Sequence, residues 1–347
     1  MMRRARLAIR RSPGVAVIAF FSLVVSGACL AWFAVHARPA TEAVRLRNAL
    51  LFEAYAPEGD FSWTPGRIPD SYAVDEASRL PALRSVLARM NLRDAMTDWM
   101  RVKTIAEHLH EAKNRGGAAK EDLAETYEAI RDGRGYCSDF TTVFIALAAM
   151  EGIFSREWAF SFDGYGGYGH GFVEYFDRDM NRWVFLDIYN NFVVVGRDGY
   201  LMSALEVRRA MDSREGSYRL IPVSNHSIGF PSDAAARDYY LNGIGQWYLW
   251  WGNAVEEYDA NWLLRLARKV GRTSEQLVAI LTGYYPRIHI LQTRDNRHFV
   301  DELVALKWKI VVFFLTGFVS GIVFLGSVSV MILRRRCGGE EKCHALT

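Results

Sequence analysis

Two long apolar runs stand near the ends of the chain, with a mixed polar and apolar stretch between them. Residues 13–35 and residues 310–333 contain no charged side chain. Each run is long enough for a helix that crosses the hydrocarbon core of a bilayer, which takes about 20 apolar residues. The pattern therefore predicts two transmembrane helices on either side of a large central domain.

The first half of this central stretch has a helical period. We expect helices over residues 41–55, 81–90, 94–113 and 120–131. A further helix is expected from about Cys137 to Gly152, where a glycine is well placed to end it. It has a wide apolar stripe at positions i, i+3, i+4, i+7 and i+8: Phe140, Val143, Phe144, Leu147 and Ala148.

The period then changes to that of short strands. Residues 156–162, 170–177, 182–188 and 192–196 are rich in aromatic and β-branched residues and are separated by turn residues, which predicts antiparallel strands. From about residue 200 the pattern becomes helical again, with further helices over 274–282 and 296–306. The order of elements predicts an α+β domain with a helical addition that leads into the second apolar run.

A dense group of aromatic residues lies within residues 233–270, and the pattern allows three interpretations of it. At helical spacing it favours core packing, but such side chains also stack on sugars or collect at a membrane interface. Its members are Tyr239, Tyr240, Trp247, Tyr248, Trp250, Trp251, Tyr258 and Trp262.

Basic residues at the two ends predict the orientation of the chain. The formal net charge of +3 is too small to indicate a nucleic-acid partner. Five arginines lie between Arg3 and Arg11, and three more follow the second run as Arg334, Arg335 and Arg336. The excess of positive charge predicts cytoplasmic termini and a central domain in the periplasm or outside the cell. A cleavable signal peptide ending near residue 37 is the alternative for the first run, and it exports the same domain.

These observations predict seven segments. In chain order they are a basic cytoplasmic N-terminus (1–12), a transmembrane helix (13–35), an extracytoplasmic helical and loop segment (37–94), a catalytic core (95–200), a helical C-terminal extension (201–309), a second transmembrane helix (310–333) and a cytoplasmic tail (334–347).

Only one of the four cysteines falls in the exported part. Cys29 lies in the first apolar run and Cys337 and Cys343 lie in the tail, so Cys137 has no exported partner for an intrachain disulfide. A buried filler is the ordinary interpretation of a cysteine beside an apolar helix face. However, Cys137 is expected at a helix N-terminus, which favours the thiolate form that a nucleophile needs.

A base and an orienting carboxylate are expected on the two strands that follow. His170 lies near the start of one strand and Asp187 near the end of the next. If the turn between them centres between Arg178 and Asp179, the two side chains are directly opposed, about 4.5–5.5 Å apart at Cβ. A loop one residue longer would spoil this opposition.

The sequence resembles the transglutaminase-like superfamily, whose core is papain-like, in three blocks. The first runs from Gly135-Tyr136-Cys137 to Gly152-Ile153, the second is His170 with Phe172, Val173 and Glu174, and the third is Trp183 before Asp187. The resemblance implies a cysteine-bearing helix packed on an antiparallel sheet and a catalytic triad of Cys137, His170 and Asp187. Two positions depart from the family pattern, namely Gly171, often alanine or serine, and Ile188, often proline.

The resemblance implies a membrane-anchored thiol enzyme that forms a thioacyl intermediate at an amide bond of a cell-envelope peptide or protein. Hydrolysis and transfer to an amine both remain open. The alternative is a non-catalytic assembly module, for example beside exported polysaccharide machinery. The family's second oxyanion donor stays unassigned, since no glutamine precedes Cys137 and neither Trp99 nor Asn114 is decisive. No cofactor is expected, and His108 and His110 are spaced unlike a zinc pair.

The glycine-rich loop directly before His170 also has two interpretations. Its sequence, FDGYGGYGHGF, combines glycines with two tyrosines. It predicts either a mobile aromatic rim that closes over a substrate or an ordinary surface loop between two strands.

Overall fold

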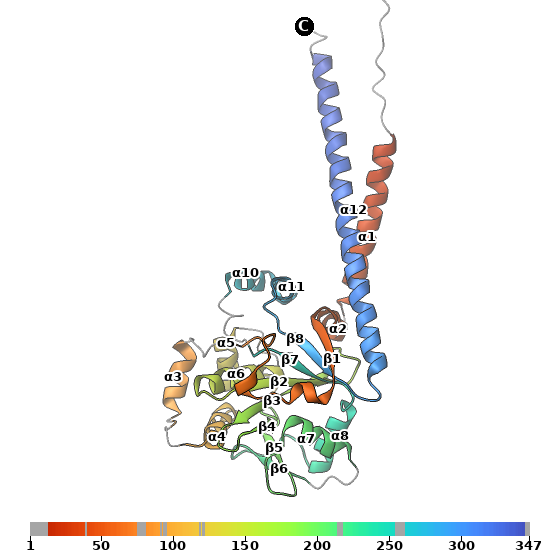
Figure 1. Ribbon diagram of the computed structural model, residues 1–347. Coiled ribbons are helices and arrows are strands. Elements are labelled where there is room, and N and C mark those ends of the chain that lie inside the picture. Colours follow the sequence, from red (N-terminus) through yellow and green to blue (C-terminus); the bar gives the residue numbers. More distant parts are fainter. Residues whose placement is uncertain are drawn as a thin grey trace, which may run out of the picture. The chain divides into compact units, whose positions relative to one another are not determined.

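The computed structural model describes residues 13–38, 40–74, 81–90, 92, 96–117, 119, 122–213, 218–253 and 261–343 (Figure 1). The chain divides into two compact units. One comprises Met1–Leu46 with Ala305–Thr347, and the other comprises Arg47–Val304. The expected basic N-terminus, with its arginines, lies outside the described residues.

The first unit contains two helices that are long and apolar enough to cross a membrane. They are α1, Pro13–His36, and the apolar part of α12, Arg297–Cys343. The two long helices expected at the ends of the chain are therefore present, and α12 begins well before the apolar run.

Small residues bring α1 and α12 close together within this unit. The Ser26 hydroxyl donates to the carbonyl of Gly317 at 3.2 Å. A Cβ added at Gly317 would lie only 3.1 Å from the Cβ of Cys29. The rings of Trp32 and Phe313 stack with centroids 4.6 Å apart. Such small-residue contacts are typical of helix pairs in membranes.

A six-stranded sheet forms the centre of the second unit. Its strand order is β1-β8-β7-β2-β3-β4, and all neighbours are antiparallel except β1 and β8. The strands are β1 Phe52–Ala56, β2 Ser155–Ser161, β3 Gly169–Asp177, β4 Arg182–Leu186, β7 Trp247–Trp251 and β8 Arg287–Leu291. A small antiparallel sheet consists of β5, Phe192–Val195, and β6, Arg219–Pro222. The predicted α+β class with a mostly antiparallel sheet is confirmed.

The helices between α1 and α12 follow the hydrophobic pattern in part, but residues 52–55 of the helix expected over 41–55 belong to strand β1. These helices are α2 Ala40–Leu51, α3 Pro81–Arg89, α4 Asp98–Leu109, α5 Leu123–Arg131, α6 Cys137–Met150, α7 Ala204–Asp212, α8 Asp233–Asn242, α10 Trp262–Val270 and α11 Arg272–Thr282, with short 3₁₀ helices over Glu58–Phe61 and Pro65–Arg67.

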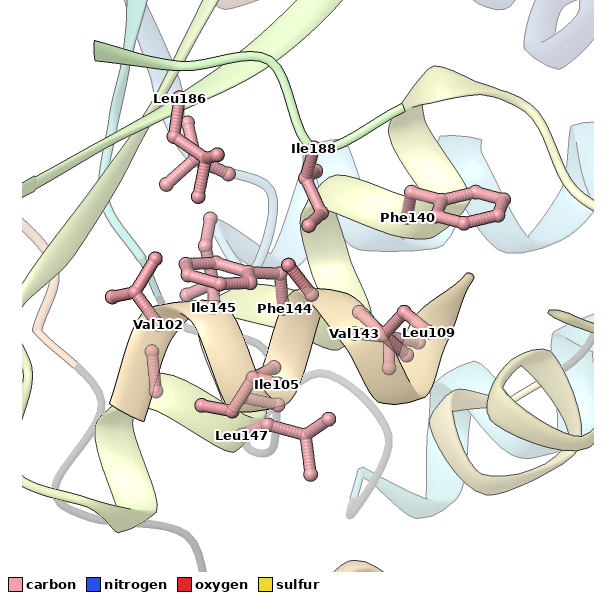
Figure 2. Packing of buried hydrophobic residues seen from close by; sticks show 14 of the residues in the cluster. Val102, Ile105, Leu109, Phe140, Val143, Phe144, Ile145, Leu147, Leu186 and Ile188 are labelled. Atoms are coloured by element: carbon pink, nitrogen blue, oxygen red, sulfur yellow. The ribbon is translucent and has the colours of Figure 1, made fainter. Parts of the chain in front are cut away.

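The apolar stripe of α6 lies in a core between α4 and the sheet (Figure 2). All five residues of the predicted stripe are buried. Val102, Ile105 and Leu109 of α4 pack against α6, and Leu186 at the end of β4 belongs to the same cluster. This packing fixes the axis of α6 on the sheet and hence the position of its first residue.

A second, largely aromatic core lies on the other side of the sheet. Along β3 the side chains alternate, so that Val173 belongs to the α6 core and Phe172 to the aromatic core. Most of the aromatic group after residue 233 is buried here or along β7, so core packing is the correct interpretation for those residues. Trp262 is the exception because 64% of it is exposed, and Tyr258 lies outside the described residues.

The expected helical extension over residues 201–309 is wrong in part. This segment supplies β6, β7 and β8, and the last two lie inside the main sheet. The compact unit Arg47–Val304 therefore joins the expected core with the segments on either side of it. The apolar run of β7 is buried along its whole length, and such a run has no period that distinguishes a strand from a buried helix.

Candidate active site

A glycine loop with a positive φ places Cys137 at the start of α6. Gly135 has φ of +150°, and a Cβ there would come within 3.0 Å of the Phe140 ring and 3.2 Å of Ile130. The loop therefore needs glycine. The Asp139 carboxylate accepts from the backbone N–H of Tyr136 at 2.8 Å. Cys137 is then the first residue of α6, free and half-buried, at the positive end of the helix.

His170 stands at the start of β3 with its side chain buried. Its Nε2 lies 2.8 Å from Oδ2 of Asp187, whose side chain is also buried. The imidazole is enclosed by aromatic rings, with centroids 5.7 Å away for Phe160 and Tyr239 and 6.2 Å for Tyr189. These rings limit the rotation of His170 and exclude water from its contact with Asp187.

The hairpin achieves this contact with a register that differs from the expected one. Asp177 pairs with Arg182, so the turn centres between Asp179 and Met180, one residue later than direct opposition requires. The turn is set by Asp177, whose carboxylate accepts from the Met180 N–H at 2.8 Å, and by Asn181 at φ of +50°. The ladder pairs Val173 with Leu186, and its continuation would place Asp187 opposite Phe172. His170 and Asp187 are diagonal neighbours on one face, and such neighbours remain within reach of each other.

Asp187 is held by more donors than the sequence indicates. Its Oδ2 accepts from His170, from the side-chain amide of Asn190 at 2.7 Å and from the Tyr240 hydroxyl at 2.8 Å. Its Oδ1 accepts from the backbone N–H of Asn190 at 3.0 Å. Asn190 lies three residues after Asp187, so its contact with Asp187 could be predicted from the sequence as a local turn. Tyr240 comes from α8, and no local sequence pattern indicates its contact with Asp187.

Burial has a smaller effect on the pKa of His170 than the nearby charges and hydrogen bonds have together. Burial alone lowers the pKa of His170, but the charge and hydrogen bond of Asp187 and a hydrogen bond with Cys137 together raise that pKa to about 10. Burial would raise the pKa of Asp187, but His170 and the donors from Asn190 lower it overall. Since Nε2 faces Asp187, Nδ1 is the ring nitrogen left for the thiol. The structure thus brings together all three residues that the sequence singled out.

Two further polar side chains, Asn114 and Tyr189, are linked to the glycine loop that precedes Cys137. The side-chain amide of Asn114 donates to the carbonyl of Gly135 at 3.2 Å, and Asn114 also hydrogen-bonds with the Tyr189 side chain. Burial raises the pKa of Tyr189, and the nearby Cys137 and Asp187 raise it further. Asn114 thus ties the glycine loop before the cysteine to the segment after Asp187.

The glycine-rich loop before His170 is anchored at its centre. Tyr165 adopts a positive φ of +64° and is fully buried, and its carbonyl accepts from the Asn48 amide at 2.8 Å. Gly164 N–H donates to the Gln246 side chain at 2.7 Å. The expectation of a two-tyrosine mobile rim is therefore wrong for Tyr165, and Tyr168 is the tyrosine of this loop that is exposed.

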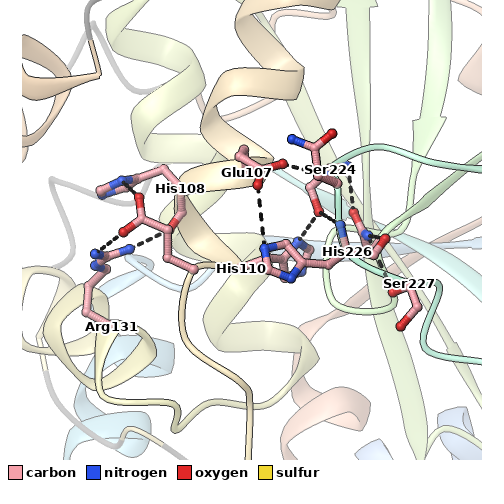
Figure 3. Close-up of polar contacts among 10 residues, drawn as sticks. Glu107, His108, His110, Arg131, Ser224, His226 and Ser227 are labelled. Atoms are coloured by element: carbon pink, nitrogen blue, oxygen red, sulfur yellow. Dashed lines mark hydrogen bonds and ion pairs between the residues drawn. The ribbon is translucent and has the colours of Figure 1, made fainter.

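Polar contacts also hold the segment that follows Asp187 (Figure 3). Asn191, at φ of +59°, donates to the carbonyl of His226 at 2.7 Å and accepts from the Ser224 N–H at 2.9 Å. The side chain of His108 hydrogen-bonds to Glu111 and Tyr127, while His110 points towards Ser224 and His226 in Figure 3. The two histidines face different ways, as expected.

A second buried polar cluster lies on strands β2 and β3, around Arg156 and Glu174. Glu174 Oε2 accepts from Arg156 Nε and from Trp158 Nε1, both at 2.8 Å, and its Oε1 accepts from the Ala204 N–H at 2.7 Å. The guanidinium carbon lies 3.9 Å from the ring centroid of Trp183. Glu174 and Trp183, which belong to the sequence blocks of the resemblance, therefore support the fold.

One group among the described residues has the composition of a metal site. Asp98, Asp177 and Asp179 place ligand atoms within 4.8 Å of one another. Arg178 already pairs with Asp98, donating from Nε at 2.8 Å, and Asp179 accepts from the Asp98 N–H at 2.8 Å. The group serves as an ion-pair cluster that ties the start of α4 to the β3–β4 turn.

Comparison with known proteins identifies one family. Residues 87–188 match the model of the transglutaminase-like superfamily. No curated protein and no solved structure matches the chain. The matched segment includes α6, β3 and β4, and it ends directly after Asp187. Residues 87–188 are a domain of the transglutaminase-like superfamily, as the three sequence blocks predict.

Proposed function

We propose that the protein is a membrane-anchored thiol enzyme in which Cys137, His170 and Asp187 act as a catalytic triad on an amide bond. The observation that carries the proposal is the position of His170, which is hydrogen-bonded to both Asp187 and Cys137. A family match alone leaves open whether the domain is catalytic. A thiol at a helix N-terminus, a base beside it and a buried carboxylate behind that base together form a nucleophilic site.

In this proposal the proton of the Cys137 thiol is already held on Nδ1 of His170 before the substrate binds, since the pKa of His170 is raised, and the sulfur then attacks the carbonyl carbon of the amide. The C–N bond then breaks, and the imidazolium returns its proton to the leaving amine. The product is a thioacyl group on Cys137. Asp187 stays ionised and holds the imidazole in the orientation that both proton transfers need.

In this proposal two groups stabilise the oxyanion of the tetrahedral intermediate. The backbone N–H of Cys137 lies in the first turn of α6, where such donors have no partner within the helix. We assign the second donor to Tyr189. Its oxygen accepts from the Asn114 amide, so its proton remains available for another acceptor near the thiol.

The resolving nucleophile and the substrate are finer points of the same proposal. Water would make the enzyme a peptidase or amidase, and an amine would make it a cross-linking acyltransferase. Residues 13–35 and 310–333 are proposed as membrane spans, with the domain between them in the periplasm or outside the cell. The proposed substrate is then a peptide or protein amide of the cell envelope, and a membrane complex or polysaccharide machinery is the proposed partner.

Trapping of the thioacyl intermediate tests the proposed function. The purified full chain is incubated with an acyl-donor amide library prepared from cell-envelope peptides, quenched in acid and analysed by peptide mass spectrometry. We expect an acyl adduct on Cys137 that hydroxylamine removes and that His170→Gln prevents. A dansylated primary amine added to a parallel sample separates transfer from hydrolysis. A folded chain that never acylates Cys137 would leave the assembly-module alternative.

Orientation is tested separately with a membrane-impermeant maleimide on intact spheroplasts. We expect labelling of Cys137 but not of Cys337 or Cys343 until the cells are permeabilised. Labelling of the tail cysteines in sealed cells would reverse the proposed orientation. An isolated chain that begins near residue 37 would show that the first run is a cleaved signal.

A further inference from the structure

Helices α10 and α11 form a hairpin with a large exposed apolar face. The two helices pack against each other, and Arg268 on α10 donates to Glu275 on α11 at 2.9 Å. Leu264, Ala267 and Ala279 are buried. One side of the hairpin is thus packed within the protein, and the other side is exposed.

On this other side, large apolar residues recur one helical turn apart. Along α10 they are Trp262, Leu266 and Val270, of which 64%, 56% and 79% are exposed. Along α11 Leu277 and Leu281 repeat the spacing, with 50% and 70% exposed. Positions i, i+4 and i+8 share one face of a helix, so these side chains form a continuous stripe on each helix.

This face is unlike the remainder of the unit Arg47–Val304. Leu263 and Tyr284, both 37% exposed, lie in or beside the hairpin, and the remaining exposed large apolar side chains in the described part of the unit stand singly, as Val74, Met100, Tyr136, Tyr168 and Tyr200. Single exposed apolar residues are normal, whereas a contiguous patch marks a surface that is covered in the working protein. The hairpin therefore needs an occupant for its exposed face.

Charge and chain connectivity favour one occupant. Arg265 and Lys269 are exposed beside the apolar stripe of α10, and residues 261–270 contain no acidic side chain. An amphipathic helix with basic residues at the edge of a Trp- and Leu-rich face is typical of helices that lie in the interfacial region of a bilayer. Both chain connections of this unit lead to helices with the length and composition of membrane spans.

We infer that the α10–α11 hairpin lies on the bilayer surface, with its apolar face in the boundary between lipid headgroups and acyl chains and its basic residues against anionic headgroups. The inference rests on the proposed membrane anchoring. Tethering at both ends keeps the hairpin at a high effective concentration near the membrane, so even a weak surface affinity holds it there. The thiol domain is then restricted to the membrane surface, which favours membrane-bound or membrane-proximal amide substrates.

Spin-label accessibility in nanodiscs tests this surface. The full chain, with its native cysteines replaced by serine, receives single labels through Leu266→Cys, Val270→Cys or Leu281→Cys. Matched control labels through Met100→Cys and Tyr200→Cys occupy exposed positions elsewhere in the unit. The nanodiscs contain phosphatidylethanolamine and phosphatidylglycerol. Power saturation then compares collision with oxygen, which enters lipid, and with a water-soluble nickel chelate.

We expect the three hairpin labels to collide more with oxygen than with the nickel chelate, and the two control labels to show the reverse. Equal exposure of hairpin and control labels to the nickel chelate would overturn the inference. So would protection from both reagents in nanodiscs and in detergent, since a partner protein or a second copy would then cover the face. Retention of the chain in nanodiscs tests the membrane anchoring separately. Alkylation of Cys137 in the unaltered chain tests the proposed triad separately.

Discussion

Two buried ion pairs, each with one residue on strand β3, resemble each other closely, and we propose that they serve different purposes. His170 and Asp187 form one, with Nε2 and Oδ2 2.8 Å apart, and Arg156 and Glu174 form the other, with Nη2 and Oε2 2.7 Å apart. All four side chains are almost completely buried. His170 and Glu174 lie four residues apart on one strand, within one block of the family signature.

The two pairs differ in whether a hydrogen-bonding atom is left over for a further partner. Glu174 accepts from Arg156, from the Trp158 indole and from the start of α7, so both of its oxygens are used within the fold. In the other pair, Asp187 occupies one nitrogen of His170 and leaves the second for Cys137. A buried charge pair is therefore not by itself a sign of catalysis. The distinguishing feature is a proton-transfer atom directed at a nucleophile.

The largest effect that we expect is a loss of Cys137 acylation when the His170–Asp187 pair is altered but not when the Arg156–Glu174 pair is altered. Asp187→Asn should lower acylation of Cys137 by an acyl p-nitroanilide roughly 10³–10⁴-fold, because the imidazole loses its enforced tautomer. The matching p-nitrophenyl ester should lose less, since its leaving group needs no proton. Glu174→Gln is the control and should alter acylation by the folded fraction little. Equal losses in the two variants would remove the distinction drawn here.

For the free energy of unfolding we expect the large effect at the Arg156–Glu174 pair. Arg156→Met leaves the Glu174 charge buried without its partner and should lower the free energy of unfolding by about 3–5 kcal/mol, measured by urea denaturation. Adding Glu174→Gln to this variant should restore part of the loss. The half-buried pair Arg182–Glu206 on the neighbouring strand is the matched control, and Arg182→Met should cost about 1 kcal/mol or less. A loss for Arg156→Met no larger than this control would show that its cluster is dispensable.

The pH dependence of stability is a third way to sharpen the comparison. The pKa of His170 is raised to about 10 in the folded chain, so its stabilising contribution is complete below the unfolded value of about 6.5 and is lost as the pH rises towards 10. The limiting slope is about 1.4 kcal/mol per pH unit. The lowered pKa of Asp187 adds stability above about pH 4, which is lost on acidification. Urea denaturation between pH 6 and pH 9.5 should show a shallower decline for His170→Gln than for the unaltered chain, and parallel curves would contradict this assignment.

The smallest predicted effect concerns Tyr240, the donor that sequence reasoning missed. Tyr240→Phe removes one of four hydrogen bonds to Asp187 and should lower the free energy of unfolding by about 1 kcal/mol. Tyr200→Phe changes an exposed tyrosine and is the control. A Tyr240→Phe variant as stable and as readily acylated as the unaltered chain would show that Asn190 suffices to hold the carboxylate.

Local patterns predicted the parts of the site that depend on neighbouring residues. The glycine loop and apolar stripe located the start of α6 at Cys137, and alternating residues located β3 and β4. The turn was placed one residue too early because Asp177 caps it, and a capping side chain leaves no trace in the hydrophobic period. His170 still meets Asp187 because the register error of two positions preserves the face.

Long-range partners escaped the sequence for a different reason. Strand β1 follows α2 without a break, and its pairing with β8 joins segments more than 200 residues apart. Tyr240 reaches Asp187 across 53 residues. Such contacts depend on the packing of the whole sheet, and no local period encodes them. The exposed face of α10 was hidden in the same way, because Trp262 belongs to an aromatic group that is otherwise mostly buried.

The central claim is that His170 activates Cys137, and the pH dependence of alkylation tests it most directly. The full chain with Cys29, Cys337 and Cys343 replaced by serine is treated with iodoacetamide from pH 5 to pH 10, and the adduct at Cys137 is followed by mass spectrometry. We predict rapid alkylation at pH 7 that slows roughly tenfold or more in both His170→Ala and His170→Gln, with the midpoint moving towards the free-thiol value of about 8.5. Unfolding curves confirm that each variant is folded. A midpoint at or above 8.5 in the unaltered chain, unchanged in the folded variants, would contradict the account.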